Sequence, residues 1–323
     1  MPNFRRSYYP KELVITPSTR GVFVISATPF DERGALDLAS VPSLVDYYLG
    51  HGVHGITLLG MMGEANKLTQ EESTRLVAAM MRAIAGRVPV VVGVSHPSLV
   101  AMRELAHESM MAGAAGVMIA PPTGLRTDDQ QFSWFGDCCA ALGPDVPVVY
   151  QDYPPTTGVF LSASLYLRIA SAYPQVAMLK MEDHPGLDKI TRIRAAEGRE
   201  DVRRTAIVVG NGGLLLPQGL ARGADGVMTG FGYPEMLVQV YNRHAAGDVD
   251  GAEGVYDTYL PLVTYEQQPG YGLAVRKEIL RRRGAIQTAT VRAPGPRLSA
   301  PDVAELDRVL ARLAARLPGG PHA

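Results

Sequence analysis

The chain has 323 residues, of which 46% are apolar and 20% are charged, and its formal net charge is −1. This composition is typical of a globular protein with a sizeable core, and the charge balance argues against nucleic acid or an anionic membrane as a partner. The two cysteines, Cys138 and Cys139, are adjacent, so they offer neither a disulfide framework nor metal-ligand spacing. This favours a reducing, cytoplasmic setting. No apolar run approaches the roughly 20 residues that span a bilayer, and the polar N-terminus is unlike a signal peptide.

A short glycine unit recurs along the chain and marks the starts of buried strands. It begins at Gly52, Gly113 and Gly223, and each time a second glycine follows three residues later, before an apolar run. The first glycine suits the position after a helix end, where a positive φ is needed. We expect the second to allow close approach of helix and strand. Together with the repeat Val-Pro-Val-Val, the unit predicts eight strands, at 21–27, 55–59, 89–94, 116–120, 147–151, 176–180, 206–210 and 226–230.

The segments between these runs show the apolar spacing of helices. Thr69 and Glu72 form a capping box that opens one of them, and the others are expected at 97–112, 128–142, 162–173 and 186–197. Parallel strands separated by crossover helices, about 30 residues apart, predict an α/β protein of the (β/α)₈ TIM-barrel class. An open doubly wound sheet is the alternative, but the first strand is not followed by GxGxxG.

The remaining chain is expected to be helical. Helices are predicted at 236–245, 251–264, 270–283 and 300–315. The predicted organisation is an N-terminal arm over residues 1–20, a barrel over 21–234, an appended C-terminal helical segment over 235–315 and a tail over 316–323.

One lysine differs from the others in its context. Of 31 basic residues only five are lysine, and Lys11, Lys67, Lys189 and Lys277 lie in polar contexts that favour the surface. Lys180 instead ends an apolar run, at the C-terminal end of the sixth expected strand, where barrel active sites lie. Burial disfavours the charged form of a lysine, and a neutral amine can attack a carbonyl, which arginine cannot do. The alternative is a lysine that leaves the barrel and pairs with Glu182 or Asp183.

Several motifs at the expected strand ends carry a resemblance to a known family. They are Ala27-Thr28-Pro29-Phe30, Gly60-Met61-Met62-Gly63-Glu64, Tyr150, Lys180 and Gly210-Asn211-Gly212. In this order, the chain resembles the dihydrodipicolinate synthase/N-acetylneuraminate lyase superfamily, from about residue 21 to residue 315. The resemblance implies a class I lyase that needs no metal and no organic cofactor, and that assembles as a homotetramer.

The resemblance also implies roles for individual residues. Lys180 would form an imine with a 2-oxo acid, and Tyr150 would relay protons. The loop Gly60–Gly63 would offer backbone N–H groups to the substrate carboxylate. The substrate-binding set is Thr28, Gly60, Met61, Met62, Gly63, Gly210 and Asn211. The structural alternatives are a Tyr150 that is only a capped aromatic at the rim, an Asn211 that shapes a turn, and glycines that only turn the chain. Glu64 is expected to hold its loop.

The departures from the family pattern concern the substrate. Met61 and Met62 stand where the family has two hydroxyl residues, so a relay through that position is lost. Pro121-Pro122-Thr123 replaces the synthase tyrosines, and the segment Tyr150–Gly158 has one extra residue and lacks the synthase arginine. These changes argue against a lysine-pathway synthase. The stretch 270–278 resembles branches that act on deoxy-sugar acids, such as keto-deoxy-arabonate dehydratase.

The sequence therefore predicts a Schiff-base aldolase or dehydratase for a small 2-oxo acid, such as pyruvate or a 2-keto-3-deoxy sugar acid. The alternatives are 4-hydroxy-tetrahydrodipicolinate synthase activity proper and a non-catalytic barrel that binds an oxo acid. A metal-dependent hydrolase built on His51 and His54 is a further alternative, although this pair precedes the second strand, at the wrong end of a barrel.

Overall fold

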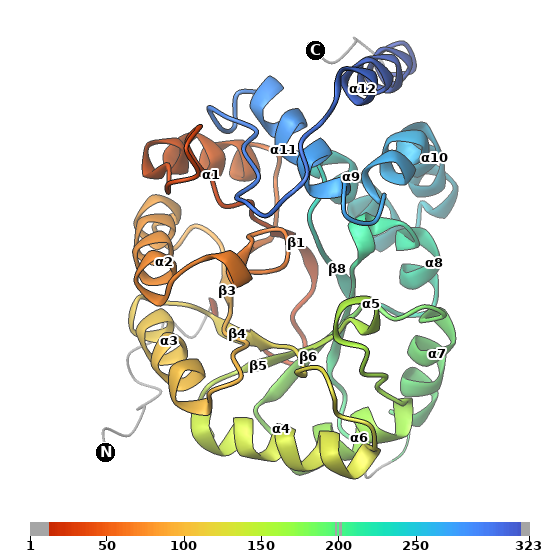
Figure 1. Cartoon of the computed structure of the whole chain (residues 1–323). Helices are drawn as coiled ribbons and strands as arrows, with labels where there is room; N and C mark the ends of the chain where they lie inside the picture. The colour runs from red at the N-terminus through yellow and green to blue at the C-terminus, as the bar shows by residue number, and fades with distance from the viewer. Residues whose placement is uncertain (1–12, 198, 200–201, 318–323) are drawn as a thin grey trace.

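A closed barrel of parallel strands forms the centre of the protein (Figure 1). The structure is a computed structural model that describes residues 13–197, 199 and 202–317. The strands are β1 (Gly21–Ile25), β2 (Gly55–Leu58), β3 (Val90–Gly93), β4 (Gly116–Ile119), β5 (Val148–Asp152), β6 (Val176–Met181), β7 (Ala206–Val209) and β8 (Gly226–Thr229). Each begins and ends within two residues of its expected range. Because β1 also pairs with β8, the barrel is confirmed and the open sheet is wrong.

Helices surround the barrel and cover its outer face. They are α1 (Val41–Gly50), α2 (Gln70–Ile84), α3 (Leu99–Met111), α4 (Asp128–Leu142), α5 (Pro154–Thr157), α6 (Ala163–Ala172), α7 (Leu187–Ala196) and α8 (Leu216–Ala221), with short 3-10 turns at Leu38–Ser40, Ala65–Lys67 and Asn211–Gly213. The capping box of α2 is confirmed, since Glu72 N–H donates to the Thr69 hydroxyl at 3.1 Å and Thr69 N–H donates to the Glu72 carboxylate at 3.0 Å. The sequence supplied no ranges for α1, α5 and α8.

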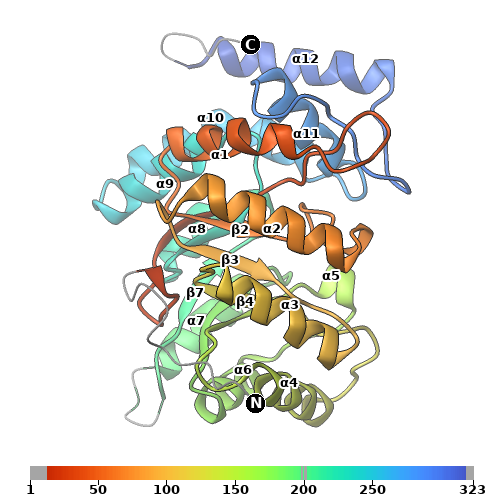
Figure 2. The same ribbon diagram turned by 90° about the vertical axis from the view of Figure 1, so that its left-hand side faces the viewer.

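The C-terminal segment forms the expected helices on one side of the barrel. They are α9 (Pro234–Ala245), α10 (Val249–Glu266), α11 (Gly272–Arg282) and α12 (Ala300–Ala314). Figure 2 shows α12 as the outermost of them, beyond α10 and α11. Among the described helices none is both long and apolar enough to cross a membrane.

The described part of the N-terminal arm lies against the barrel beside the start of β4. Ile15 is buried, and its N–H donates to the carbonyl of Ala115 at 2.9 Å, just before β4. The arm residues 1–12 and the tail residues 318–323 lie outside the described residues.

The repeated glycines act as expected at the first position and differently at the second. Gly52, Gly113 and Gly223 have φ of 75°, 97° and 91°, which confirms their place after helix ends. The second glycine does not serve a helix contact. A Cβ at Gly226 would collide with the backbone of Gly21 in β1, and one at Gly55 would collide with the Phe23 ring. The expected helix–strand role is therefore wrong, and these glycines allow neighbouring strands to approach.

Two lysines that the sequence placed at the surface are buried. Lys277 is fully buried, and its Nζ lies 2.5 Å from a Glu64 carboxylate oxygen. Lys189 is 8% exposed and lies 2.6 Å from Asp152 and 2.7 Å from Asp183. The surface expectation is wrong for both. Lysine side chains are rarely buried unless they are paired, and here each ammonium group has a carboxylate partner.

We expect Gly226→Ala to destabilise the fold by about 3 kcal/mol or more, because the new Cβ meets backbone that cannot move without opening the β1–β8 seam. Gly254→Ala in α10 is the matched control. Nothing lies within 4 Å of a Cβ at that position, so the change should stabilise by about 0.5–1 kcal/mol. Urea denaturation measures both free energies of unfolding. Equal values would show that the seam tolerates a side chain.

Candidate active site

Lys180 points into the barrel interior near the end of β6. It is 1% exposed, and it pairs in register with Gln151 of β5 and Val208 of β7. Its Nζ lies 2.6 Å from a carboxylate oxygen of Glu182. The alternative in which Lys180 leaves the barrel is therefore wrong, although the pairing with Glu182 that belonged to it is present.

Glu182 is held by residues from the ends of two neighbouring strands. The Gln151 side-chain N–H donates at 2.8 Å to the same oxygen that contacts Lys180. The Asn211 backbone N–H donates to the other oxygen at 3.4 Å, and its side chain donates to the Glu182 carbonyl at 3.0 Å. At Gly210 a Cβ would collide with the Glu182 side chain. Gly210 and Asn211 thus position Glu182 from the end of β7.

This arrangement places a proton acceptor beside a buried amine. An ammonium group must lose a proton before it can attack a carbonyl carbon, and a carboxylate in hydrogen-bond contact can take that proton. The same carboxylate, once protonated, can return the proton to a nearby substrate atom. The pair can therefore perform both nucleophilic and acid–base chemistry.

The structure does not bring Tyr150 to Lys180. Tyr150 pairs in register with Leu179, so it points to the opposite side of the sheet from Lys180. Its ring stacks on Phe135 of α4, with ring centroids 5.0 Å apart. The hydroxyl is buried without a hydrogen-bond partner within the described residues, and burial strongly raises its pKa. The interior residue at this level of β5 is Gln151.

The loop after β2 is a tight turn with free backbone donors. The Gly63 N–H donates to the Gly60 carbonyl at 2.9 Å, and the Thr28 hydroxyl donates to the Gly63 carbonyl at 2.6 Å. Thr28 therefore braces the loop from the end of β1. In the described part of the chain, the N–H groups of Met61 and Met62 have no protein acceptor.

The two methionines of this loop occupy different surroundings. Met62 is buried against β8, where a Cβ at Gly230 would collide with its sulfur. Met61 is 48% exposed and lines a cavity of about 460 Å³. Of the two side chains, only that of Met61 is therefore available to a ligand.

This cavity opens at the barrel mouth, by which we mean the end where the strands terminate. Its lining includes Gly60, Met61, His96, Met118 and Gln151, from β2 to β5 and the loops that follow. Gln151 links the cavity to the Glu182–Lys180 pair. The cavity therefore borders the loop after β2 and, through Gln151, adjoins the Lys180–Glu182 pair.

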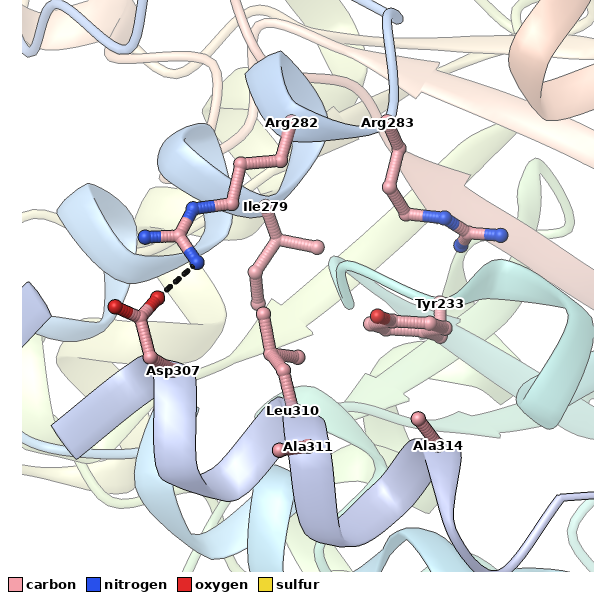
Figure 3. A pocket seen from close by; sticks show the side chains of 8 residues that line it. All are labelled: Tyr233, Ile279, Arg282, Arg283, Asp307, Leu310, Ala311 and Ala314. Carbon is pink, nitrogen blue, oxygen red and sulfur yellow. Dashed lines mark hydrogen bonds and ion pairs between the residues drawn. The ribbon is translucent and has the colours of Figure 1, made fainter. Parts of the chain in front are cut away.

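A second cavity, of about 240 Å³, lies between α11 and α12 (Figure 3). Arg282 in its wall pairs with Asp307, and Arg283 lies 2.7 Å from Glu235. The rest of the lining is Tyr233 and aliphatic side chains. Both arginines are thus engaged in ion pairs. This cavity offers no amine or free carboxylate for the predicted chemistry.

The remaining reactive side chains are engaged elsewhere. His54 accepts a hydrogen bond from Val22 N–H at 3.1 Å, at the end of the barrel opposite to the mouth, and His51 contacts the carbonyl of Tyr47. No cluster of three or more potential metal ligands occurs among residues 13–197, 199 and 202–317. Cys138 and Cys139 are free and buried, and burial raises the pKa of each to about 12.

Glu64 holds its loop, as the sequence suggested. It has a left-handed backbone with φ of 52°, and its oxygens contact Lys277 at 2.5 Å and Lys67 at 2.9 Å. It also accepts a hydrogen bond from Arg292 N–H at 3.0 Å. The loop is thereby anchored to α11 and to the segment that follows it.

Sequence reasoning missed Glu182 and Gln151 as members of the site. The period-2 alternation of β6 did place Glu182 on the face of Lys180, which was a usable signal. For β5 no such signal existed, because all of its five residues are buried and the pattern does not show which face is interior.

The chain is similar to known proteins over nearly its whole length. Residues 18–313 match the model of the dihydrodipicolinate synthetase family. The chain is 31% identical to an L-2-keto-3-deoxyarabonate dehydratase of Azospirillum brasilense, over 92% of this chain and 96% of the relative. It is 28% identical to a 4-hydroxy-tetrahydrodipicolinate synthase of Methanosphaerula palustris, over 90% and 98%. A crystal structure of a dihydrodipicolinate synthase from Rhodopseudomonas palustris matches with a TM-score of 0.91 and 44% identity, over 93% and 99%.

We expect Lys277→Met to destabilise the protein by about 3–5 kcal/mol, because it leaves the buried Glu64 carboxylate without its closest cation. Arg243→Met removes an exposed ion pair with Asp248 and should change the free energy of unfolding by less than about 1 kcal/mol. Thermal and urea unfolding of the two variants measures the contrast. A Lys277 variant as stable as the Arg243 variant would mean that Lys67 and Arg292 hold Glu64 unaided.

Proposed function

The chain belongs to the dihydrodipicolinate synthetase family and is a class I lyase for small 2-oxo acids, and we propose that it dehydrates a 2-keto-3-deoxy sugar acid through an imine on Lys180. The observation that carries the proposal is the interior contact of 2.6 Å between Lys180 and Glu182. This contact supports a role for Lys180 as nucleophile and for Glu182 as its proton acceptor.

The proposed reaction uses these two groups in sequence. Glu182 takes a proton from Lys180, and the neutral amine attacks C2 of the substrate. Glu182, now protonated, returns its proton to the carbinolamine hydroxyl, which leaves as water to give a protonated imine that draws electrons from C3. Glu182 removes a proton from C3 to give an enamine. The enamine expels the C4 hydroxyl, which leaves as water with a proton from Glu182. Hydrolysis of the imine consumes one water, so the overall reaction removes one water.

The loop after β2 would bind the substrate carboxylate. The free N–H groups of Met61 and Met62 are donors suited to an anion. Their thioether side chains cannot donate, so the loop contributes no hydroxyl to proton transfer. This leaves Glu182 as the group that moves protons in our proposal.

A second candidate is 4-hydroxy-tetrahydrodipicolinate synthase activity. It is favoured by the 44% identity to the solved Rhodopseudomonas palustris protein that bears the synthase name. The altered loop and the segment after Tyr150 argue for the dehydratase, as does the Azospirillum brasilense relative. Condensation of pyruvate with aspartate semialdehyde, assayed beside dehydration of 2-keto-3-deoxy sugar acids, separates the two. A non-catalytic binding barrel would turn over none of them.

We also propose a homotetramer located in the cytoplasm. The family resemblance supports the assembly, and the two free cysteines are compatible with a reducing compartment. Light scattering of the purified protein tests the assembly, and a mass of one or two chains would contradict it.

We expect borohydride to trap pyruvate, or a 2-keto-3-deoxy sugar acid, covalently on Lys180. Peptide mass spectrometry should find the added mass on this residue. Lys180→Arg is the most informative variant for testing the imine, because it keeps a cation beside Glu182 but cannot form an imine. It should show neither trapping nor turnover. Trapping of the wild-type protein at another lysine would refute the role of Lys180.

We expect Glu182→Gln to slow imine formation on Lys180 and to lower kcat by about 100-fold or more, the usual contribution of a general acid–base group. Exchange of the pyruvate methyl protons for deuterium, followed by NMR, reports the same proton transfer without turnover. Tyr150→Phe is the control and should retain both activities within about twofold, because its hydroxyl faces α4. If Tyr150→Phe loses exchange and Glu182→Gln keeps it, the proton path runs through the tyrosine.

A further inference from the structure

Arg276 of α11 reaches the barrel mouth beside the turn that follows β7. A Cβ at Gly212 would lie 3.0 Å from its Nη2 and would collide with the Gln267 side chain. Gly212 directly follows Asn211, which contacts Glu182. The Arg276 side chain is 14% exposed, so it is largely enclosed by protein. A guanidinium group from the C-terminal helices is thereby part of the mouth.

Glu182 and Arg276 lie beside the same short turn, residues 210–212. Gly210 lies against Glu182, and Gly212 lies against Arg276. Two residues of extended chain span at most about 7 Å. A substrate held at C2 by Lys180 extends from C2 to C5 by roughly 4 Å, at about 1.5 Å a bond. The turn and the substrate therefore have lengths of the same order, which makes Arg276 a candidate contact for the far end of a substrate held at Lys180.

Tyr153 lies near both Glu182 and Arg276. It is half-buried at the start of α5. Burial raises the pKa of its hydroxyl, the charge of Glu182 raises it further, and the charge of Arg276 lowers it. Tyr153 thus lies within electrostatic range of both groups.

The charge of Arg276 is already balanced, which restricts what it can bind. Its Nε donates at 2.8 Å to the buried Glu266, which also accepts from Gly232 N–H at 3.1 Å. Burial raises the pKa of Glu266 to about 7, so its carboxylate form dominates above that pH. Lys180 is balanced by Glu182, and Lys189 faces both Asp152 and Asp183. Among these paired groups there is no surplus positive charge for a second substrate carboxylate.

Arg276 nevertheless keeps hydrogen-bond donors. Its Nε contacts Glu266, and its Nη2 contacts Glu266 and Gln267. In the described chain its Nη1 has no acceptor. A charge-balanced guanidinium with spare N–H groups suits a neutral hydroxyl oxygen, which accepts a hydrogen bond without requiring a counter-charge.

We propose that Arg276 binds the terminal hydroxyl of the substrate, and that the enzyme acts on 2-oxo monoacids ending in a hydroxymethyl group and discriminates against diacids. This inference rests on the proposed function and specifies its substrate class. Arg276 acts here as a specificity-determining residue, distinct from the proton transfer assigned to Glu182.

Three probe acids that are identical from C1 to C3 and carry a hydroxyl on C4 test the inference. They are a 2-keto-3-deoxypentonate, which ends in a hydroxymethyl group, 4-hydroxy-2-oxoglutarate, which ends in a carboxylate, and 4-hydroxy-2-oxobutanoate, which lacks the fifth carbon. At about pH 8, above the pKa of Glu266, we expect kcat/KM to be highest for the hydroxymethyl acid and lowest for the diacid. Arg276→Gln should lower the preference for the hydroxymethyl acid over the truncated acid by about tenfold or more, as expected for loss of a charged donor.

Two further variants separate specificity from folding. Arg276→Lys keeps a cation for Glu266 but changes the donor geometry, so it should remain folded and lose the same preference. Arg282→Gln, on the same helix but facing Glu278 and Asp307, should leave the preference unchanged. The inference is overturned if the Arg276 variants retain the wild-type preference or if the wild-type enzyme favours the diacid. If no acid can be trapped on wild-type Lys180, the proposed function fails and this inference fails with it.

Discussion

The ion pair between Lys180 and Glu182 is the interaction on which the site depends. Placing two charges in a barrel interior costs several kcal/mol per ion, and the attraction between them offsets this only when further hydrogen bonds are present. Gln151 and Asn211 supply those bonds from β5 and β7, and Gly210 leaves the space that the carboxylate needs. Barrel closure fixes all three strands relative to one another. Since a buried pair adds little net stability, its chemical use is the better explanation for its presence.

The sequence predicted the barrel well because apolar runs and glycine repeats report burial and chain reversal locally. It could not predict which face of β5 is interior. Alternation shows that Val149 and Gln151 share one face and Tyr150 the other, but in a parallel strand buried on both sides neither face is marked by polarity. The pairing of β5 with β6 is also irregular between Val148 and Val149, which adds a shift that no local pattern reveals. The direction of Tyr150 was therefore beyond prediction, whereas Lys180 and Glu182 follow from alternation once one of them is placed.

The buried lysines show a second limit of sequence reasoning. Lys277 lies 213 residues from Glu64, and Lys189 lies 37 residues from Asp152. Each of these lysines sits in a helix with a polar composition, so burial is unfavourable until a distant carboxylate is brought to it. The fold, and not the local sequence, supplies that partner. Arg276 belongs to the same category, because its position at the mouth depends on how α11 packs near the end of β7.

A physical connection links the two methionines of the loop after β2, the outward direction of Tyr150 in β5 and the position of Glu182 after β6. Without hydroxyl side chains at 61 and 62, and with Tyr150 turned toward α4, the proton of the Lys180 amine needs another acceptor. Glu182 meets that need because the strand pleat returns every second residue to the same face. A carboxylate at this place also brings negative charge into the barrel. The paired charges around it, Lys180 with Glu182 and Arg276 with Glu266, keep that region of the mouth near neutrality. A substrate with one carboxylate, held by loop N–H groups, adds a single charge to this balance, whereas a second carboxylate would meet Glu182 and Glu266 without a free cation to offset it.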